Sequence, residues 1–263
     1  MRRVLFAICC VLFSQLATAS YFAQNGISSI MLRNADMLAK GQKMLDLSVF
    51  MDSYSLPRSS ATDEDGYVLP GAAYGYSDKL SLALAAPMVA TSNSKLGLRE
   101  VNAIAKYSLG GSRDDGVGVA LSGYTSLMST NSSKGFGSGE RGYGLAMNIS
   151  LYGDVTTLNL SLGGERSDIK APGASPMFRS EQQLMVAGGI EVRRRENWQY
   201  LLEGVYTRTN DIDDNFLLMP GARYTPNQRM SFYAGAAIGL RKDKSKPDWR
   251  VTTGVNINLG GGD

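Results

Sequence analysis

Residues 143–151 read YGLAMNISL, and this stretch decides the fold class. Its large apolar side chains occupy every second position: Tyr143, Leu145, Met147, Ile149 and Leu151. The positions between them carry only Gly, Ala, Asn and Ser. Successive side chains of an extended strand point to opposite faces, so this spacing predicts one apolar face and one face of small or polar residues. A strand of about 9 to 11 residues can cross a bilayer, and this stretch has that length.

The same alternation recurs along the chain from about residue 43 onward. Twelve stretches show it: 45–51, 66–75, 80–86, 101–108, 117–121, 143–151, 158–165, 184–193, 198–206, 216–224, 230–240 and 249–259. The stretch 216–224 fits least well, because it is apolar on both faces and Pro220 has no N–H for the strand ladder. We therefore predict an all-β fold, a transmembrane antiparallel β-barrel of about 12 strands formed by residues 43–263.

The connections between these stretches alternate in length. Long polar connections are predicted at 55–65, 91–97, 129–141, 167–179, 210–215 and 242–247, and short ones at 77–78, 110–115, 153–154, 194–197 and 226–228. Extracellular loops and periplasmic turns of membrane barrels differ in this way. A soluble β-sandwich or lipocalin-like barrel is the alternative, but it has a polar outer face and no strict order of loop lengths. Aromatic residues near the ends of apolar faces favour the membrane barrel: Tyr107, Tyr143, Trp198, Tyr200 and Trp249.

The N-terminus has the pattern of a secretory signal peptide. Arg2 and Arg3 precede an apolar run at 4–13, and the small residues of Ala17-Thr18-Ala19 follow. Ten apolar residues are too few for a transmembrane helix, which needs about 20. We expect residues 1–19 to be removed after Ala19, and the mature protein to reach the outer membrane of a Gram-negative bacterium.

Composition excludes several kinds of chemistry. The sequence contains no histidine, and its two cysteines, Cys9 and Cys10, both lie in the predicted signal peptide. Histidine-dependent nucleophilic catalysis and thiolate metal sites are therefore unavailable, and we expect no enzyme, no metal and no cofactor. The 27 basic residues become 25 after loss of Arg2 and Arg3, against 24 acidic residues. This balance gives no reason to expect a nucleic-acid partner.

Residues 20–42 precede the first predicted strand and do not alternate. Their end, 30–40, has helical spacing and carries Arg33, Asp36 and Lys40. One interpretation is a plug that enters the barrel from the periplasm and pairs with charges of the lumen. The other is a disordered leader or a periplasmic cap, and the sequence leaves both open.

Charged side chains recur on the face that would point into the barrel. These lumen-facing candidates are Asp46, Asp52, Lys106, Glu165, Glu191, Arg193, Glu203 and Arg250. They either line an open channel or form salt bridges that fill the lumen, since twelve strands lie between the filled eight-stranded barrels and the open porins. Glu191 and Glu203 lie on neighbouring predicted strands, but no further motif surrounds them, and we predict no catalytic residue.

One hairpin resembles a known family. Tyr74-Gly75-Tyr76-Ser77-Asp78-Lys79-Leu80-Ser81-Leu82, followed by Pro87, is similar to a motif of outer-membrane barrels labelled "MetA-pathway of phenol degradation" or putative transporter. Shorter similarities are Lys106-Tyr107, Gly221 with Arg223-Tyr224, Pro247-Asp248-Trp249 and Gly254-Val255. The chain departs from the family at Leu98-Arg99-Glu100-Val101, where a Gly-Asp pair is common, and at its end, which lacks a closing aromatic residue. The resemblance implies an outer-membrane barrel that moves small, even hydrophobic, compounds.

The expected function is a passive outer-membrane channel or transporter for small solutes. Its partners would be outer-membrane lipid, the barrel-insertion machinery and a small-molecule solute. The alternative is a non-conducting structural or surface-interaction barrel that acts through its extracellular loops, with 129–141 and 167–179 as the candidates.

A barrel of this kind resists unfolding by detergent at room temperature. We expect the unboiled protein to migrate faster than the boiled protein in a detergent gel, because the folded barrel stays compact. A chain recovered in soluble form from the periplasm, with one mobility before and after boiling, would contradict the predicted fold.

Overall fold

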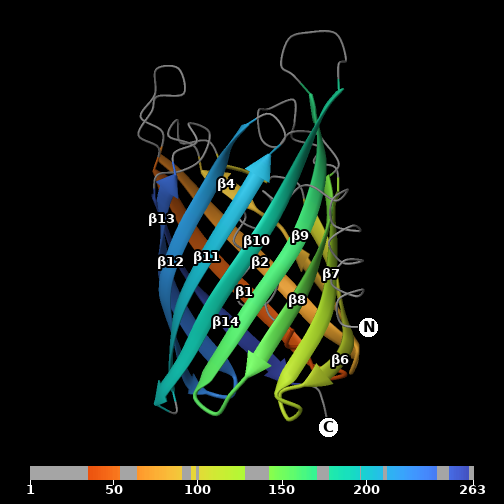
Figure 1. Cartoon of the computed structure of the whole chain (residues 1–263), viewed down its shortest axis with the longest axis vertical. Coiled ribbons are helices and arrows are strands. Elements are labelled where there is room, and N and C mark those ends of the chain that lie inside the picture. The colour runs from red at the N-terminus through yellow and green to blue at the C-terminus, as the bar shows by residue number, and fades with distance from the viewer. Residues whose placement is uncertain are drawn as a thin grey trace, which may run out of the picture.

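The computed structural model describes residues 35–53, 64–90, 96–98, 101–127, 142–170, 178–195, 197–209, 212–241 and 249–260. Within these residues, antiparallel strands make up nearly all of the regular structure (Figure 1). They are β1 (Lys43–Ser53), β2 (Glu64–Ser77), β3 (Leu80–Ala85), β4 (Met88–Ala90), β5 (Leu96–Leu98), β6 (Val101–Ser112), β7 (Val117–Leu127), β8 (Gly142–Tyr152), β9 (Thr156–Lys170), β10 (Phe178–Arg195), β11 (Trp198–Thr209), β12 (Ile212–Asn227), β13 (Met230–Arg241) and β14 (Trp249–Gly260). Among these residues there is no helix that is long and apolar enough to cross a membrane.

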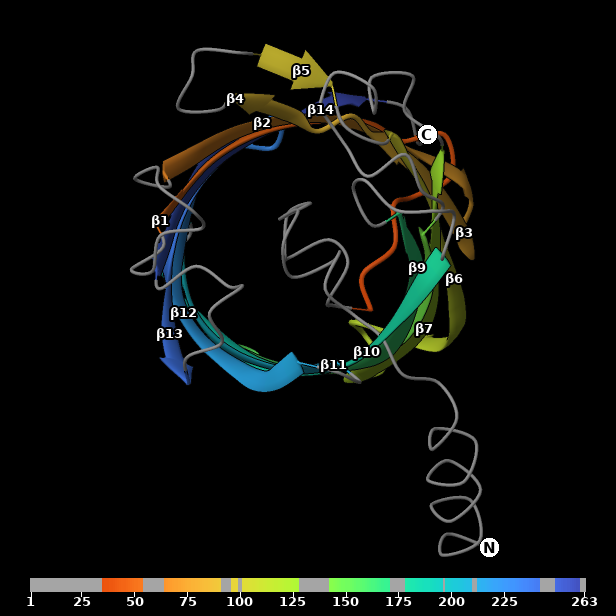
Figure 2. The ribbon, with the colours of Figure 1, turned by 90° about the horizontal axis from the view of Figure 1, so that it is seen from above.

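The sheet closes on itself. β1 pairs with β2 along one edge and with β14 along the other, so that Leu47 lies opposite both Pro70 and Val255 (Figure 2). The remaining strands of the ring follow in sequence order, from β2 through β3 and β6 to β14. The described residues thus form a closed twelve-stranded antiparallel barrel, as the alternation predicted. β4 pairs with the first part of β2, and β5 pairs with β4.

The third predicted stretch, 80–86, forms β3, and Pro70 and Pro87 lie where the pairing of β2 passes from β3 to β4. β2 pairs with β3 from Gly71 onward and with β4 up to Val68, and the pairing is interrupted between them. Proline has no N–H for the ladder, but its carbonyl still accepts a hydrogen bond from the Ala86 N–H, at 2.9 Å. Beyond Pro87 the chain pairs with β2 again, with Met88 opposite Val68. The predicted connection at 91–97 follows β4, and its last two residues, 96 and 97, belong to β5.

The outer face of the barrel is an apolar belt. Residues predicted to face lipid are exposed, among them Leu84 at 54%, Leu160 at 50% and Val251 at 47%. A soluble protein of this size would bury such side chains, so their regular exposure around the ring is that of a protein embedded in lipid. The predicted aromatic residues also lie on this outer face: Tyr107, Tyr143, Trp198, Tyr200 and Trp249. Near the short turn before β11, Trp198 packs against Tyr200 and Tyr224 with ring centroids 6.3 and 4.9 Å apart.

The short turns between described strands lie together at one end of the barrel (Figure 1). Two predicted loops were too long, because strand pairing continues into them. β9 and β10 remain paired from the barrel out to Lys170 and Phe178, and β12 already begins at Ile212. The apolar alternation could not show this pairing, because the residues at these positions are polar. Outside the membrane, backbone hydrogen bonds hold the two strands of a hairpin together, and the hairpin needs no apolar face. Residues 128–141 and 171–177 lie outside the described part of the chain.

The apolar belt gives a position-dependent test of the fold. Replacing Leu160, on the outer face of β9, by arginine should lower the free energy of unfolding by about 2–4 kcal/mol, because the charge would enter the hydrocarbon core. The matched change Leu151→Arg, beside a short turn, should cost at most about 1 kcal/mol. Guanidinium unfolding in lipid vesicles, followed by tryptophan fluorescence, measures both. Equal losses for the two variants would contradict this orientation of the barrel.

Candidate functional site in the barrel lumen

The described residues before β1, residues 35–42, contact the inner wall of the barrel. Residues 35–42, orange-red in Figure 2, run along the inner wall from the short-turn end. Gly41 has a φ of 80°, and this turn leads into β1. The Gly41 N–H donates to the Gly75 carbonyl at 2.7 Å, and the Gly75 N–H donates to the Gln42 carbonyl at 2.9 Å. The segment is thereby joined to β2 before the first strand begins.

Gly75 is required at this junction. A Cβ atom there would lie 2.0 Å from the Ala39 carbonyl oxygen, a distance that no real Cβ contact reaches. The hairpin motif that suggested a family resemblance therefore includes a glycine against which the N-terminal segment packs.

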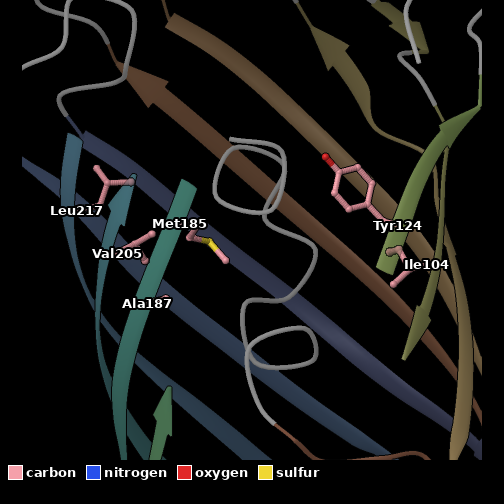
Figure 3. Packing of buried hydrophobic residues seen from close by; sticks show 6 residues of the cluster. All are labelled: Ile104, Tyr124, Met185, Ala187, Val205 and Leu217. Carbon is pink, nitrogen blue, oxygen red and sulfur yellow. The ribbon is translucent and has the colours of Figure 1, made fainter. Parts of the chain in front are cut away.

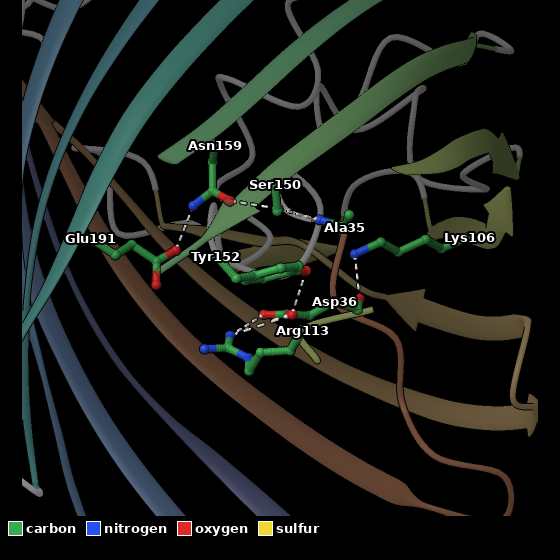
Figure 4. A network of polar contacts seen from close by, with 8 residues as sticks. All are labelled: Ala35, Asp36, Lys106, Arg113, Ser150, Tyr152, Asn159 and Glu191. Carbon is green, nitrogen blue, oxygen red and sulfur yellow. Dashed lines mark hydrogen bonds and ion pairs between the residues drawn. The ribbon is translucent and has the colours of Figure 1, made fainter. Parts of the chain in front are cut away.

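Asp36 is the centre of the contacts between this segment and the wall (Figure 4). Its carboxylate pairs with Arg113 at 3.1 Å and accepts a hydrogen bond from the Tyr152 hydroxyl at 2.8 Å. The Arg113 guanidinium lies 4.7 Å from the centroid of the Tyr152 ring, so the two partners also contact each other. Both charged side chains are partly exposed, at 46% for Arg113 and 41% for Asp36, and solvent screens the ion pair. The hydrogen bonds and the packing around it must supply much of the attachment.

Side chains of three strands bind the backbone of the segment. The Ala35 N–H donates to Ser150 on β8 at 2.8 Å, and the Leu38 N–H donates to Ser81 on β3 at 3.2 Å. Lys106 on β6 donates from Nζ to the Asp36 carbonyl oxygen at 2.6 Å. A segment without a strand partner needs such bonds, because buried backbone groups are costly when unpaired. The wall thus replaces the sheet ladder that this segment lacks.

The polar network extends around the barrel from Ser150. Its hydroxyl donates to Asn159 on β9 at 2.6 Å, and the Asn159 amide donates to Glu191 on β10 at 2.7 Å (Figure 4). Glu191 also interacts electrostatically with Arg223 on β12. Hydrogen bonds therefore connect the N-terminal segment with β8, β9 and β10, and the electrostatic interaction of Glu191 with Arg223 extends this set of contacts to β12.

A second polar cluster lies on the β1 and β13 walls. The carboxylate of Asp46 accepts hydrogen bonds from Ser48 at 2.8 Å and from the Tyr233 hydroxyl at 3.1 Å, and these two hydroxyl groups also contact each other. Tyr233 reaches them across Gly254, where a Cβ atom would lie 2.3 Å from its hydroxyl oxygen. Arg223 interacts electrostatically with Asp46 as well.

The structure distributes the other predicted residues around the wall. Glu165 on β9 is buried, and Arg250 on β14 is buried with its guanidinium 5.6 Å from the Phe50 ring centroid. Arg193 is exposed and Glu203 is half-buried. The strand register places Glu203 opposite Gly189, while Glu191 bonds to Asn159, so the two glutamates belong to different contacts. The Asp52 backbone pairs with that of Arg250, and its side chain lies outside what the structure describes.

Of the three residues predicted for a plug, only Asp36 contacts the wall through its side chain in a described interaction. Lys40 is exposed, and Arg33 lies outside the described residues. The predicted helix over 30–40 is absent from its described part, because residues 35–39 are irregular and bind wall side chains.

Sequence reasoning missed four residues that hold the segment: Ser81, Arg113, Ser150 and Tyr152. The serines stand at inward positions of alternating strands, and such positions can be recognised in the sequence. Arg113 lies in a turn and Tyr152 at a strand end, where only the folded barrel brings them near Asp36.

The lumen wall also has an apolar part. Ile104 and Tyr124 lie on one side of the barrel, and Met185, Val205 and Leu217 lie across from them (Figure 3). All five side chains lie on the inner face of the barrel, and all five are buried. The inner face is therefore not uniformly polar, in contrast to the simple alternation predicted.

Comparisons with known proteins identify the fold. No protein-family model and no curated protein sequence matches the chain. Solved structures that match include an outer membrane channel from Pseudomonas putida F1, with a TM-score of 0.62, 10% identity and coverage of 86% of this chain and 98% of that one. The NanC porin matches with a TM-score of 0.60 and 10% identity, over 82% of this chain and 100% of that one. The KdgM porin, solved in complex with disordered oligogalacturonate, gives a TM-score of 0.58 at 10% identity, over 82% and 99%. The chain therefore has the fold of the outer-membrane porins and channels of Gram-negative bacteria.

The attachment of the N-terminal segment can be tested by cysteine labelling. Leu38→Cys should react slowly with a maleimide in the folded barrel, because Leu38 is only 8% exposed. Adding Gly75→Ala should raise the rate by about tenfold, which corresponds to about 1.4 kcal/mol of lost docking free energy. Lys79→Cys, in the exposed turn beyond β2, is the control and should react at the same rate with and without Gly75→Ala. An unchanged rate at Leu38→Cys would show that the Gly75 contact does not hold the segment.

Proposed function

We propose that the protein is an outer-membrane channel for small solutes, with a lumen narrowed by its own N-terminal segment. The observation that carries this proposal is the set of contacts between Asp36 and the inner wall. A closed barrel with an apolar outer belt supports residence in the outer membrane, and the porin-like fold supports a channel. The resemblance of the 74–82 hairpin to putative transporters of small compounds points in the same direction.

The segment acts as a plug in this proposal. Residues 35–38 occupy part of the lumen cross-section beside β3, β6 and β8, and any solute must pass them. Their attachment consists of a few hydrogen bonds, each worth about 0.5–1.5 kcal/mol, or more where one partner is charged. Such an attachment is weak enough for the segment to leave the wall, and strong enough to keep it there most of the time.

The charged lumen residues would then select what enters the remaining space. Glu165, Glu191 and Arg250 belong to the inner wall, and Glu191 is joined to the segment through Asn159 and Ser150. These positions are proposed as selectivity residues, because fixed charges in a narrow pore act on permeating ions at short range.

Single-channel recording in planar bilayers tests the channel and the plug together. The full-length mature protein should give small discrete conductance steps, and a variant lacking residues 21–38 should give larger ones. This deletion keeps Ala39–Gln42 and thus the contacts with Gly75. If neither form gives conductance steps, although heat-modifiable migration shows that both are folded and inserted, the proposed channel is contradicted.

Asp36→Asn separates the plug from other effects of a deletion. Loss of the charged partner of Arg113 should weaken docking by about 1 kcal/mol, which raises the undocked fraction about fivefold. The open probability should rise accordingly. Asp78→Asn, in an exposed turn, removes the same charge and should leave the recordings unchanged. Equal recordings for Asp36→Asn and the unchanged protein would refute the role of this contact.

A further inference from the structure

The wall holds the Asp36 carboxylate with donors that suit a carboxylate in general. The Arg113 Nη2 atom lies 3.1 and 3.4 Å from its two oxygens, and the Tyr152 hydroxyl donates to one of them at 2.8 Å. Hydrogen bonds from a guanidinium to a carboxylate are charge-assisted and roughly twice as strong as neutral ones. The guanidinium also lies 4.7 Å from the Tyr152 ring centroid, and this contact positions it. Arg113 and Tyr152 therefore form a carboxylate-binding site, which Asp36 occupies.

A solute in the lumen can reach this site. Arg113 and Asp36 are both partly exposed, and Figure 4 shows their contact beside the end of the strand that carries Tyr152. The two donors belong to the barrel wall, whereas the carboxylate comes from a segment without a strand partner. The donors therefore stay in place when the segment leaves, and Arg113 then lacks the ion pair that it has in this structure. An anion from solution can replace that partner.

Other cations near Asp36 strengthen the preference for an anion. Lys106 donates to the Asp36 carbonyl oxygen at 2.6 Å, so a second positive charge lies beside the same residue. Arg223 interacts electrostatically with Asp36, and its Nε atom is buried without a hydrogen-bond partner in the described part of the chain. Arg193 and Arg113 line one polar pocket of the wall. These charges attract an anion at short range.

Two acidic residues, Glu191 and Asp154, line the same polar pocket. Asp154 is exposed in the turn before β9. Glu191 interacts electrostatically with Arg113, so it is the wall carboxylate that could compete with a solute. In the described contacts, however, Glu191 accepts a hydrogen bond from Asn159, and the ion pair of Arg113 is with Asp36. Glu191 thus leaves the Arg113 site to another carboxylate.

We propose that this wall site binds small solutes that carry a carboxylate, and that a bound solute takes the place of the Asp36 carboxylate. The solute then keeps the N-terminal segment away from the wall, because Arg113 and Tyr152 cannot hold both carboxylates. A ligand that binds only one of two states shifts the equilibrium toward that state. Small carboxylates thus widen the lumen through which they pass. This last step rests on the proposed function, whereas the exchange at Arg113 does not.

Maleimide labelling of Leu38→Cys tests the exchange in the full-length mature protein, because the rate follows the undocked fraction of the segment. Acetate is the probe, chloride at the same ionic strength is the reference for screening, and acetamide has the shape of acetate without its charge. Rising acetate should increase the rate at least about threefold over chloride, which requires about twice its dissociation constant. Acetamide should leave the rate unchanged, and Lys79→Cys should react equally in all three. Equal rates of Leu38→Cys in acetate and chloride would overturn the proposal.

Three further substitutions, each added to Leu38→Cys, locate the effect. Arg113→Gln removes the cation, so the rate in chloride should rise and acetate should raise it no further. Tyr152→Phe keeps the ring but loses the hydroxyl donor, so the response to acetate should become smaller. Arg229→Gln removes an exposed arginine from another short turn and should keep the full response. A full response in Arg113→Gln or Tyr152→Phe protein with heat-modifiable migration would refute the site.

Conductance distinguishes this inference from the proposed function. If the protein conducts but labelling of Leu38→Cys does not respond to acetate, the carboxylate site is refuted and the channel stands. If labelling responds to acetate but the protein never conducts, the channel is refuted and the exchange at Arg113 stands.

Discussion

Every backbone N–H and C=O group within a bilayer needs a partner from the protein, and the rest of this structure depends on that constraint. β1 satisfies it by pairing with β14 and β2 at once, so the ring has no free edge. The chain tolerates Pro70 because the break in the ladder coincides with the division between β3 and β4. Closure also creates an interior, and the inward side chains then need partners of their own.

The N-terminal segment meets the same constraint by different means. It has no strand beside it for most of its length, so Ser81, Ser150 and Lys106 bond to its backbone. Each of these side chains comes from a different strand, and only the folded barrel brings all three beside the backbone of the segment.

Much of the fold could be predicted because alternation is a local property. A residue such as Leu160 faces lipid since its neighbours in sequence face inward, and no distant contact is needed to know this. The strand ends were predicted less well where backbone pairing between strands, and not apolar alternation, decides how far a strand extends. β9 and β10 extend to Lys170 and Phe178 on backbone hydrogen bonds, and polar side chains there give no periodic signal. The buried apolar residues of the inner wall, such as Val205, break the expected polar face.

The sequence by itself determined the barrel, its strand number and which side chains face lipid, because strand periodicity and membrane thickness act on consecutive residues. It also drew attention to Asp36, but it left open whether the residues before the first strand enter the barrel. Only the tertiary structure decided that Asp36 meets Arg113 and Tyr152, which are 77 and 116 residues away in the chain. Such contacts depend on strand register and on ring closure, and neither is encoded in any short stretch of sequence.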